Sequence, residues 1–322
     1  MTADPGARAR PARPPRASGA ARRSAWGRAL RPWLLLAPAL LVLAVLLFWP
    51  LVRVLLVSFQ DYGLRQINTG ENNWTGLDNY RDLLGDSFLW TRVLPNTVLF
   101  AFACVALTLV LGTLVALLLT RLGRTWRVIC STAIMSAWAM PAVTGTYVWI
   151  WIFDPLDGVV SGGLDGLGLI EPRETNWFTE RWSFYAIATL NVVHHGFPFV
   201  AVTLYAALLT IPRELPEAAL CDGAGPWQRF RLITVPAIRP AFTVVTLLSI
   251  IWDVKVFAQI YLMPGGAGAN EDVLNLGVWS YIQSFSRNEY GTGSAIAVLL
   301  TLLLLAVTVV YVRTLAREGD EP

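Results

Sequence analysis

The chain has 322 residues, of which 55% belong to the hydrophobic set and 15% are charged, with a formal net charge of +3. A soluble domain usually carries about a quarter charged residues, so this composition argues against a soluble domain and predicts an integral membrane protein. Every basic residue except Lys255 is arginine, and Val256 follows Lys255. A Walker ATP-binding loop ends in Lys-Ser or Lys-Thr, so this chain is not expected to carry one.

The first 32 residues are rich in arginine, proline and alanine. Such a segment cannot bury a core, so residues 1–32 are predicted to form a disordered tail. Arg22 and Arg23 could belong to an export signal. The apolar run after them is longer than a signal core and ends at Phe48, Trp49 and Pro50 rather than at small residues, so it is predicted to remain as a membrane anchor.

Six apolar runs are long enough to cross a membrane, since a hydrocarbon core of about 30 Å needs about 20 helical residues. The predicted spans are 33–59, 94–120, 128–153, 184–211, 238–262 and 294–313. They predict an all-α polytopic membrane protein with one transmembrane domain, 33–315, and a short tail, 316–322. The three cysteines, at 104, 130 and 221, have no disulfide-framework or metal-ligand spacing.

The distribution of arginine predicts the orientation of the spans. Most basic residues lie in the N-terminal tail, in segments 121–127 and 212–239, and near the C-terminus, whereas acidic residues outnumber basic ones in the other loops. Positive segments stay inside the cell. Both termini and the segment after the fourth span are therefore predicted to be cytoplasmic.

That segment contains the sequence EAALCDGAGPWQRFRLITVP at 217–236. Pro212 and Pro216 are expected to end the fourth span, and a short helix is predicted to begin at Glu217. A turn at 222–226 and a second short helix at 227–232 would follow. The residues alone leave two interpretations open. The segment is an ordinary loop, or Ala218 and Ala219 allow close approach of another protein while Glu217 offers it a charge.

Residues 217–236 resemble the signature loop of binding-protein-dependent ABC importer permeases, in which Glu-Ala-Ala is followed by Gly and then by Ile-x-Leu-Pro at fixed spacing. The matching residues are Glu217, Ala218, Ala219, Gly223, Ile233 and Pro236. Val235 replaces the leucine of the family pattern. The resemblance implies a cytoplasmic coupling helix between spans 4 and 5 that docks on an ATPase dimer. ATP and Mg would then bind to that separate chain, so this chain would be no enzyme and would carry no cofactor.

Further similarity to the carbohydrate, maltose-permease-like branch lies in Trp74–Tyr80, in Asn96-Thr97 and in Pro264–Gly266. This resemblance implies a multi-pass protein of the bacterial cytoplasmic membrane. It also implies three further partners, namely a second six-span permease subunit, an extracytoplasmic sugar-binding protein and a di- or oligosaccharide substrate. No nucleic acid partner is expected.

The fourth span contains Gly196, Pro198 and Phe199 after two histidines, His194 and His195. Glycine and proline loosen helix hydrogen bonding, which membrane proteins tolerate where a helix lines a cavity. The alternative is a packing kink with core histidines, and adjacent residues point about 100° apart, which makes a poor metal site. The resemblance implies that Gly196 and Phe199 line the sugar path.

The fifth span contains Asp253 and Lys255, and intramembrane ionisable residues usually face a cavity or a partner. They could pair with each other, although i,i+2 spacing directs them to different helix faces. The resemblance places Ser249, Asp253 and Val256 where maltose-type permeases contact sugar. Asp253 replaces a neutral amide of the maltose transporter, which argues against maltose as the substrate.

The sequence therefore predicts one permease subunit of an ATP-driven sugar importer that works by alternating access. The alternative is an ion-coupled secondary transporter with Asp253 or the histidines as a relay, although no repeat between the two halves is evident. A membrane enzyme is disfavoured because no paired carboxylates or nucleophile–base pair are evident.

Overall fold

The computed structural model describes residues 33–171, 176–266 and 269–319. The predicted tail 1–32 lies outside the described residues, as do residues 320–322 of the predicted C-terminal tail. The chain divides into two units, Met1–Arg53 and Val54–Pro322.

The described part of the first unit belongs to an apolar helix, Trp33–Val57. It includes the π-helical turn η1, Ala44–Phe48, and the start of α2, Trp49–Val57. Residues 33–50 are almost entirely apolar. A helix that is apolar on all sides is suited to lipid or to the surface of another membrane helix.

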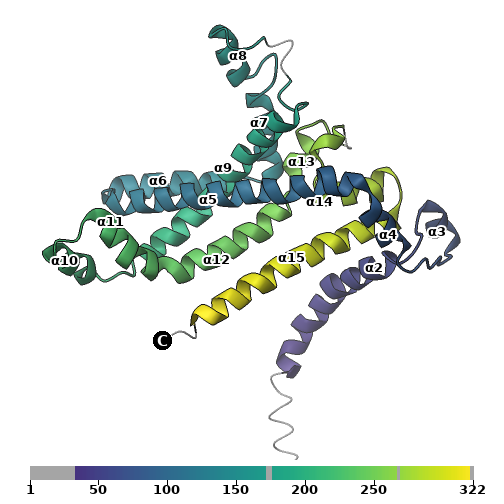
Figure 1. The fold of residues 1–322 in the computed structure, drawn as a ribbon, viewed down its shortest axis with the longest axis horizontal. Coiled ribbons are helices and arrows are strands. Elements are labelled where there is room, and N and C mark those ends of the chain that lie inside the picture. Colours follow the sequence, from purple (N-terminus) through teal and green to yellow (C-terminus); the bar gives the residue numbers. More distant parts are fainter. Residues whose placement is uncertain (1–32, 172–175, 267–268, 320–322) are drawn as a thin grey trace, which may run out of the picture. The chain divides into compact units, whose positions relative to one another are not determined.

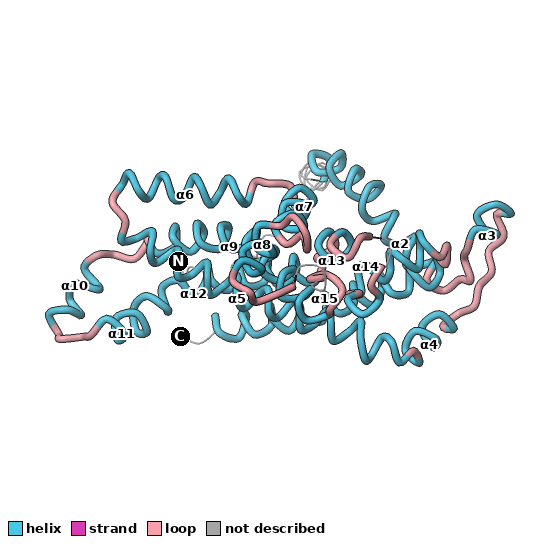
Figure 2. The backbone as a smooth tube through the Cα atoms, turned by 90° about the horizontal axis from the view of Figure 1, so that it is seen from above, coloured by secondary structure: helices cyan, strands magenta, loops and turns pink. Residues whose placement is uncertain are grey.

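The second unit is built from helices joined by short connections (Figures 1 and 2). Its helices after α2 are α3 (Leu64–Thr69), α4 (Asp78–Gly85), η2 (Leu89–Val93), α5 (Leu94–Arg121), α6 (Arg124–Trp138), α7 (Ala142–Ile152), α8 (Val159–Gly166), α9 (Arg181–Leu208), α10 (Glu214–Cys221), α11 (Pro226–Arg229), η3 (Phe230–Thr234), α12 (Val235–Val254), α13 (Ala258–Leu262), η4 (Glu271–Val273), α14 (Leu276–Tyr281), η5 (Ile282–Ser286) and α15 (Tyr290–Gly319). In both views α10 and α11 lie at one end of this unit and α3 and α4 at the other.

Among the described residues, five helices are long and apolar enough to cross a membrane, and a sixth span results if α6 and α7 are counted together. The third predicted span, 128–153, is not one straight helix, because α6 and α7 meet at 96°. Pro141 explains the break, since proline lacks an amide hydrogen and disfavours helix at Met140 before it.

The fifth predicted span also differs from the structure. The helix ends at Val254 and resumes at Ala258, so residues 255–257 interrupt it. The prediction of a separate short helix at 227–232 is wrong, because α11, η3 and α12 follow one another without a loop. The π-helical turn η3 lies just before Pro236, where the backbone loses one hydrogen bond.

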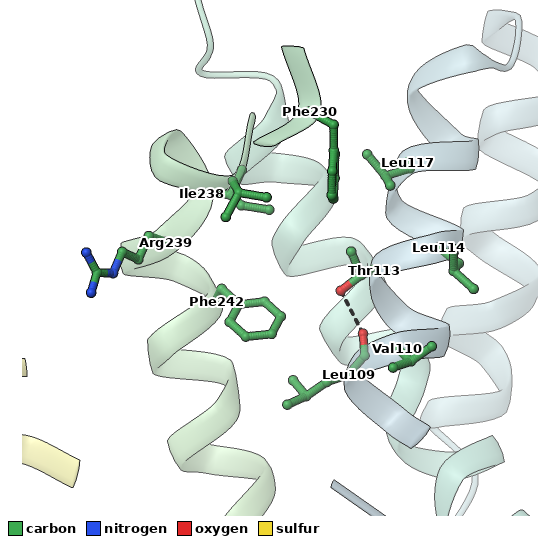
Figure 3. Close-up of a pocket in the computed structure, with 10 residues that line it drawn as sticks. Leu109, Val110, Thr113, Leu114, Leu117, Phe230, Ile238, Arg239 and Phe242 are labelled. Carbon is green, nitrogen blue, oxygen red and sulfur yellow. Dashed lines mark hydrogen bonds between the residues drawn. The ribbon is translucent and has the colours of Figure 1, made fainter. Parts of the chain in front are cut away.

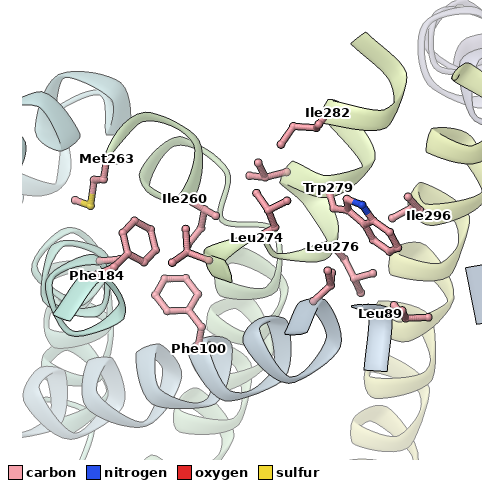
Figure 4. Close-up of a cluster of buried hydrophobic side chains, with 14 of the residues drawn as sticks. Leu89, Phe100, Phe184, Ile260, Met263, Leu274, Leu276, Trp279, Ile282 and Ile296 are labelled. Atoms are coloured by element: carbon pink, nitrogen blue, oxygen red, sulfur yellow. The ribbon is translucent and has the colours of Figure 1, made fainter. Parts of the chain in front are cut away.

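Close packing of α5 against α9 holds the centre of the unit together. A Cβ atom on Gly112 would lie 2.6 Å from Cγ1 of Val200, so only glycine fits there. Nearer the end that carries α14, a buried cluster joins α5, α9, α13, α14 and α15 (Figure 4). Its largest members include Phe100, Phe184, Ile260, Leu276, Trp279 and Ile296.

Candidate functional site

A cavity of about 580 Å³ opens where both interrupted spans meet α9. It lies within the size range of small-molecule sites. Its walls come from the end of α6, the 139–141 break, α9, the end of α12, the 255–257 break and α13. The lining residues are Trp138, Met140, Pro141, Ala142, Val192, His195, Gly196, Trp252, Asp253, Lys255, Val256, Phe257, Ala258 and Gln259. Interrupted helices are tolerated in a membrane where they line such a space.

Three of the five residues predicted to line the substrate path, Gly196, Asp253 and Val256, lie on the wall of this one cavity. Gly196 also faces α5, because a Cβ atom there would lie 3.3 Å from Cγ2 of Thr108. Its small size therefore serves helix packing as well as access to the cavity. The structure thus brings Gly196 to the same cavity as Asp253, which lies 57 positions later in the sequence.

The other two predicted residues are outside the cavity lining. The ring of Phe199 stacks on Trp138 with centroids 5.9 Å apart and meets Trp252 edge-on at 5.1 Å. Phe199 therefore supports two aromatic side chains that do line the cavity. Ser249 is buried in α12, one turn before Asp253.

Asp253 is buried, with 8% of its surface exposed, and its Oδ2 atom has no hydrogen-bond partner among the described residues. Lys255 lines the same cavity but is exposed, and no ion pair joins it to Asp253. A buried polar atom without a partner is costly, and native proteins retain few of them. Asp253 thus lines the cavity with a carboxylate of which one oxygen, Oδ2, is buried without a partner.

Gln259 is a lining residue that the sequence reasoning missed. Its side chain is buried, and Nε2 donates a hydrogen bond to Oδ1 of Asn191 at 3.0 Å. The two residues are 68 positions apart, so nothing local in the sequence links them. Trp138 and Met140 were also missed, although the Met140-Pro141 pair inside an apolar run indicated an interruption.

The two histidines occupy different surroundings. His195 lines the cavity, and both histidines line a smaller space of about 50 Å³ beside Asn191. The ring of His194 lies 6.0 Å from that of Trp149 and 6.5 Å from that of Phe197. Among the described residues no group of three or more His, Cys, Asp or Glu is arranged to hold a metal ion.

Another cavity, of about 390 Å³, lies between α5 and α12 (Figure 3). Leu109, Phe230 and Phe242 give it an apolar wall, and none of the predicted substrate residues lines it. The guanidinium of Arg239 extends away from the other labelled side chains. Apart from Thr113, whose hydroxyl donates to the Leu109 carbonyl, and Arg239, the lining is apolar, which suits a sugar poorly.

The residues predicted to couple to an ATPase lie at or next to the end of the unit formed by α10 and α11 (Figure 1). Glu217 is exposed in the first turn of α10, where the helix dipole favours an acid. Gly223 has a φ of +80°, and Ala224 N–H donates to the Ala219 carbonyl at 2.9 Å. This is a Schellman cap, which ends α10 sharply and favours glycine in the left-handed position. Ile233 lies in η3 and Pro236 in the first turn of α12.

The apolar spans, the cavity at their interruptions and the projecting α10–α11 loop are typical of a polytopic membrane transport protein. The model of the family of binding-protein-dependent transport system inner membrane components matches residues 108–318, and the chain belongs to this family. Membership places it among multi-pass permease subunits, which are not themselves enzymes.

Two relatives align over most of their length. The diacetylchitobiose uptake system permease protein DasB of Streptomyces coelicolor is 42% identical over 94% of this chain and 92% of that protein. The trehalose/maltose transport system permease protein MalF of Thermococcus litoralis is 31% identical over 87% of this chain and 92% of that protein.

The fold is also shared with a solved structure. One chain of a bacterial ABC transporter involved in the import of the acidic polysaccharide alginate superposes with a TM-score of 0.78. The match covers 91% of this chain and 99% of that chain at 19% identity, so it supports the fold alone.

Proposed function

We propose that this chain is a transmembrane subunit of an ATP-driven importer in the bacterial cytoplasmic membrane, which moves a di- or oligosaccharide by alternating access. The observation that carries the proposal is the cavity at the two helix interruptions, where Gly196, Asp253 and Val256 meet aromatic walls. The relatives named above transport diacetylchitobiose, or trehalose and maltose, by their printed names. An ion-coupled transporter would not need the loop at 217–236.

The loop at 217–236 supports a complex in which transport and ATP hydrolysis belong to different chains. Glu217 and the alanines after it are presented on a helix capped by Gly223, at the end of the unit away from α3 and α4. We propose that a separate ATPase dimer, which binds ATP and Mg, receives this helix. A second six-span permease would complete the path, and an extracytoplasmic binding protein would deliver the sugar.

Copurification and ATP hydrolysis test this proposal together. The tagged chain is extracted from its own cells in mild detergent, and the proteins that accompany it are identified by mass spectrometry. The complex is then assayed for ATP hydrolysis with its binding protein and with diacetylchitobiose, trehalose or maltose. A second permease and an ATPase should copurify, and one sugar should raise hydrolysis. A chain that purifies alone, under conditions that preserve a known transporter complex, would contradict the proposal.

A further inference from the structure

A short chain of hydrogen bonds connects the two interrupted spans beside the cavity. Gln259, at the start of α13, donates through Nε2 to Oδ1 of Asn191 on α9 at 3.0 Å. Asn191 donates in turn through Nδ2 to the carbonyl oxygen of Gly145 on α7, with the atoms 3.5 Å apart. The chain therefore joins the segment that follows the 139–141 break to the segment that follows the 255–257 break.

The donors and acceptors in this series of hydrogen bonds follow one order, from Gln259 to Asn191 to Gly145. The Gly145 carbonyl can only accept, so Asn191 must turn its amino group toward it and its oxygen toward Gln259. Gln259 must then use one N–H on Asn191. Its Oε1 atom and its second N–H remain, and no other hydrogen bond to this side chain occurs among the described residues. Asn191 thus favours the orientation of the Gln259 amide in which Nε2 points toward it.

Gln259 and Asp253 face the same cavity from different segments. Asp253 belongs to the last turn of α12, before the break, and Gln259 to α13, after it. Asp253 contributes a carboxylate to the cavity lining, with its Oδ2 atom buried, whereas Gln259 offers both an acceptor and a donor. Val256 and Phe257 lie between them along the chain and add apolar surface to the cavity wall, as does Trp252 just before Asp253. This combination suits a ring that carries hydroxyl or amide N–H groups on its edge and apolar faces.

We propose that Gln259 is a substrate-selecting residue of the cavity and that Asn191 is its positioning residue. The inference rests on the proposed function and deepens it. The substrate class is a neutral sugar that gives a hydroxyl or amide hydrogen to Asp253 and exchanges hydrogen bonds with the Gln259 amide. Gln259 on α13 thereby distinguishes between sugars in the cavity beside the 255–257 break.

The main difficulty for a test is that both residues are buried, so either change could harm folding. Replacing one partner leaves the other polar group unsatisfied, whereas replacing both by apolar groups is close to neutral. The variants are therefore Gln259→Leu, Asn191→Leu and the double variant. Gln283→Leu is the matched control, because Gln283 is buried in η5 and lies outside the cavity lining.

The measurement is the amount of sugar taken up per ATP hydrolysed by the whole complex in proteoliposomes, with saturating loaded binding protein. The probe is whichever of diacetylchitobiose, trehalose or maltose the wild type carries. This ratio does not depend on how much complex folds. We expect it to fall about tenfold in Gln259→Leu, the effect of one lost buried hydrogen bond. The ratio should fall by a similar factor in Asn191→Leu, and in Gln283→Leu it should equal the wild-type ratio.

The double variant separates selection from packing. If Gln259 binds sugar, the double variant assembles well yet keeps the low ratio, and it is no worse than Gln259→Leu alone because Asn191 acts through Gln259. If the pair only holds the helices together, the double variant recovers the wild-type ratio, and the inference is overturned. A wild-type complex that moves no sugar instead contradicts the proposed function, and the inference then fails with it.

Discussion

The guanidinium of Arg181 donates two hydrogen bonds to the side-chain oxygen of Asn96, from Nε at 3.0 Å and from Nη2 at 2.6 Å. The amide nitrogen of Asn96 donates to the carbonyl oxygens of Asp272 and Leu274, both at 2.9 Å. One buried asparagine therefore holds the start of α5, the start of α9 and the connection before α14 together.

Asn96→Ala should destabilise the protein strongly, because it removes these four hydrogen bonds and leaves buried carbonyls without partners. We expect a loss of about 2 to 4 kcal/mol, seen as a lower thermal unfolding temperature of the purified complex. Asn73→Ala is the control, since the Asn73 amide makes one exposed bond to Asp61 at 3.1 Å. Equal effects of the two changes would show that the Asn96 network adds no stability.

Glu217→Lys should abolish sugar-stimulated ATP hydrolysis while leaving membrane insertion intact. Glu217 is exposed, so its replacement removes no internal contact, and the cost at the helix N-terminus is only about 0.3 to 1 kcal/mol. Glu214→Lys is the matched control, because Glu214 lies in the same first turn and carries the same dipole cost. ATPase assays and copurification of the ATPase measure the difference. Loss of similar size in both variants would point to helix instability rather than to docking.

Gly223→Ala should weaken the sharp end of α10. A Cβ atom at Gly223 meets nothing within 4 Å, so the whole cost comes from its left-handed backbone at a φ of +80°. That cost is about 1 to 2 kcal/mol, and it should appear as reduced ATPase coupling with a small change in thermal stability. Gly123→Ala is the control, since Gly123 also has open space but a φ of −61°. Coupling that stays normal in Gly223→Ala would show that the cap is not needed.

The features of the fold that could be predicted from the sequence are those that depend on neighbouring residues. Apolar length places most of the spans, and the glycine of the Schellman cap at Gly223 could be expected from the turn at 222–226. The 96° bend between α6 and α7 could not be derived. Pro141 predicts a break, but the direction that the chain takes after it depends on packing against α9 and α13.

The sequence predicted only part of the candidate site, because some of its residues come together only through packing between distant helices. Asp253 is conspicuous because a carboxylate inside an apolar run is rare. Gln259 has no such signal, and its role depends on Asn191, which approaches it only once α9 and α13 have packed. Phe199, by contrast, was predicted to line the substrate path, but its ring lies against Trp138 and Trp252 rather than on the cavity wall.

Asp253→Asn should separate stability from transport. The carboxylate is buried and its Oδ2 atom has no partner, so a neutral amide of the same shape removes an unfavourable burial of charge. We expect the thermal stability of the complex to rise by about 1 to 3 kcal/mol while sugar uptake falls, since the change removes the carboxylate charge from the cavity wall and replaces one acceptor oxygen by a donor group. Asp82→Asn, at an exposed position on α4, should change neither quantity. Thermal unfolding and uptake by the same preparations measure both effects. A lower stability in Asp253→Asn would indicate that the charge is held by a partner, and unchanged uptake would give Asp253 a purely structural role.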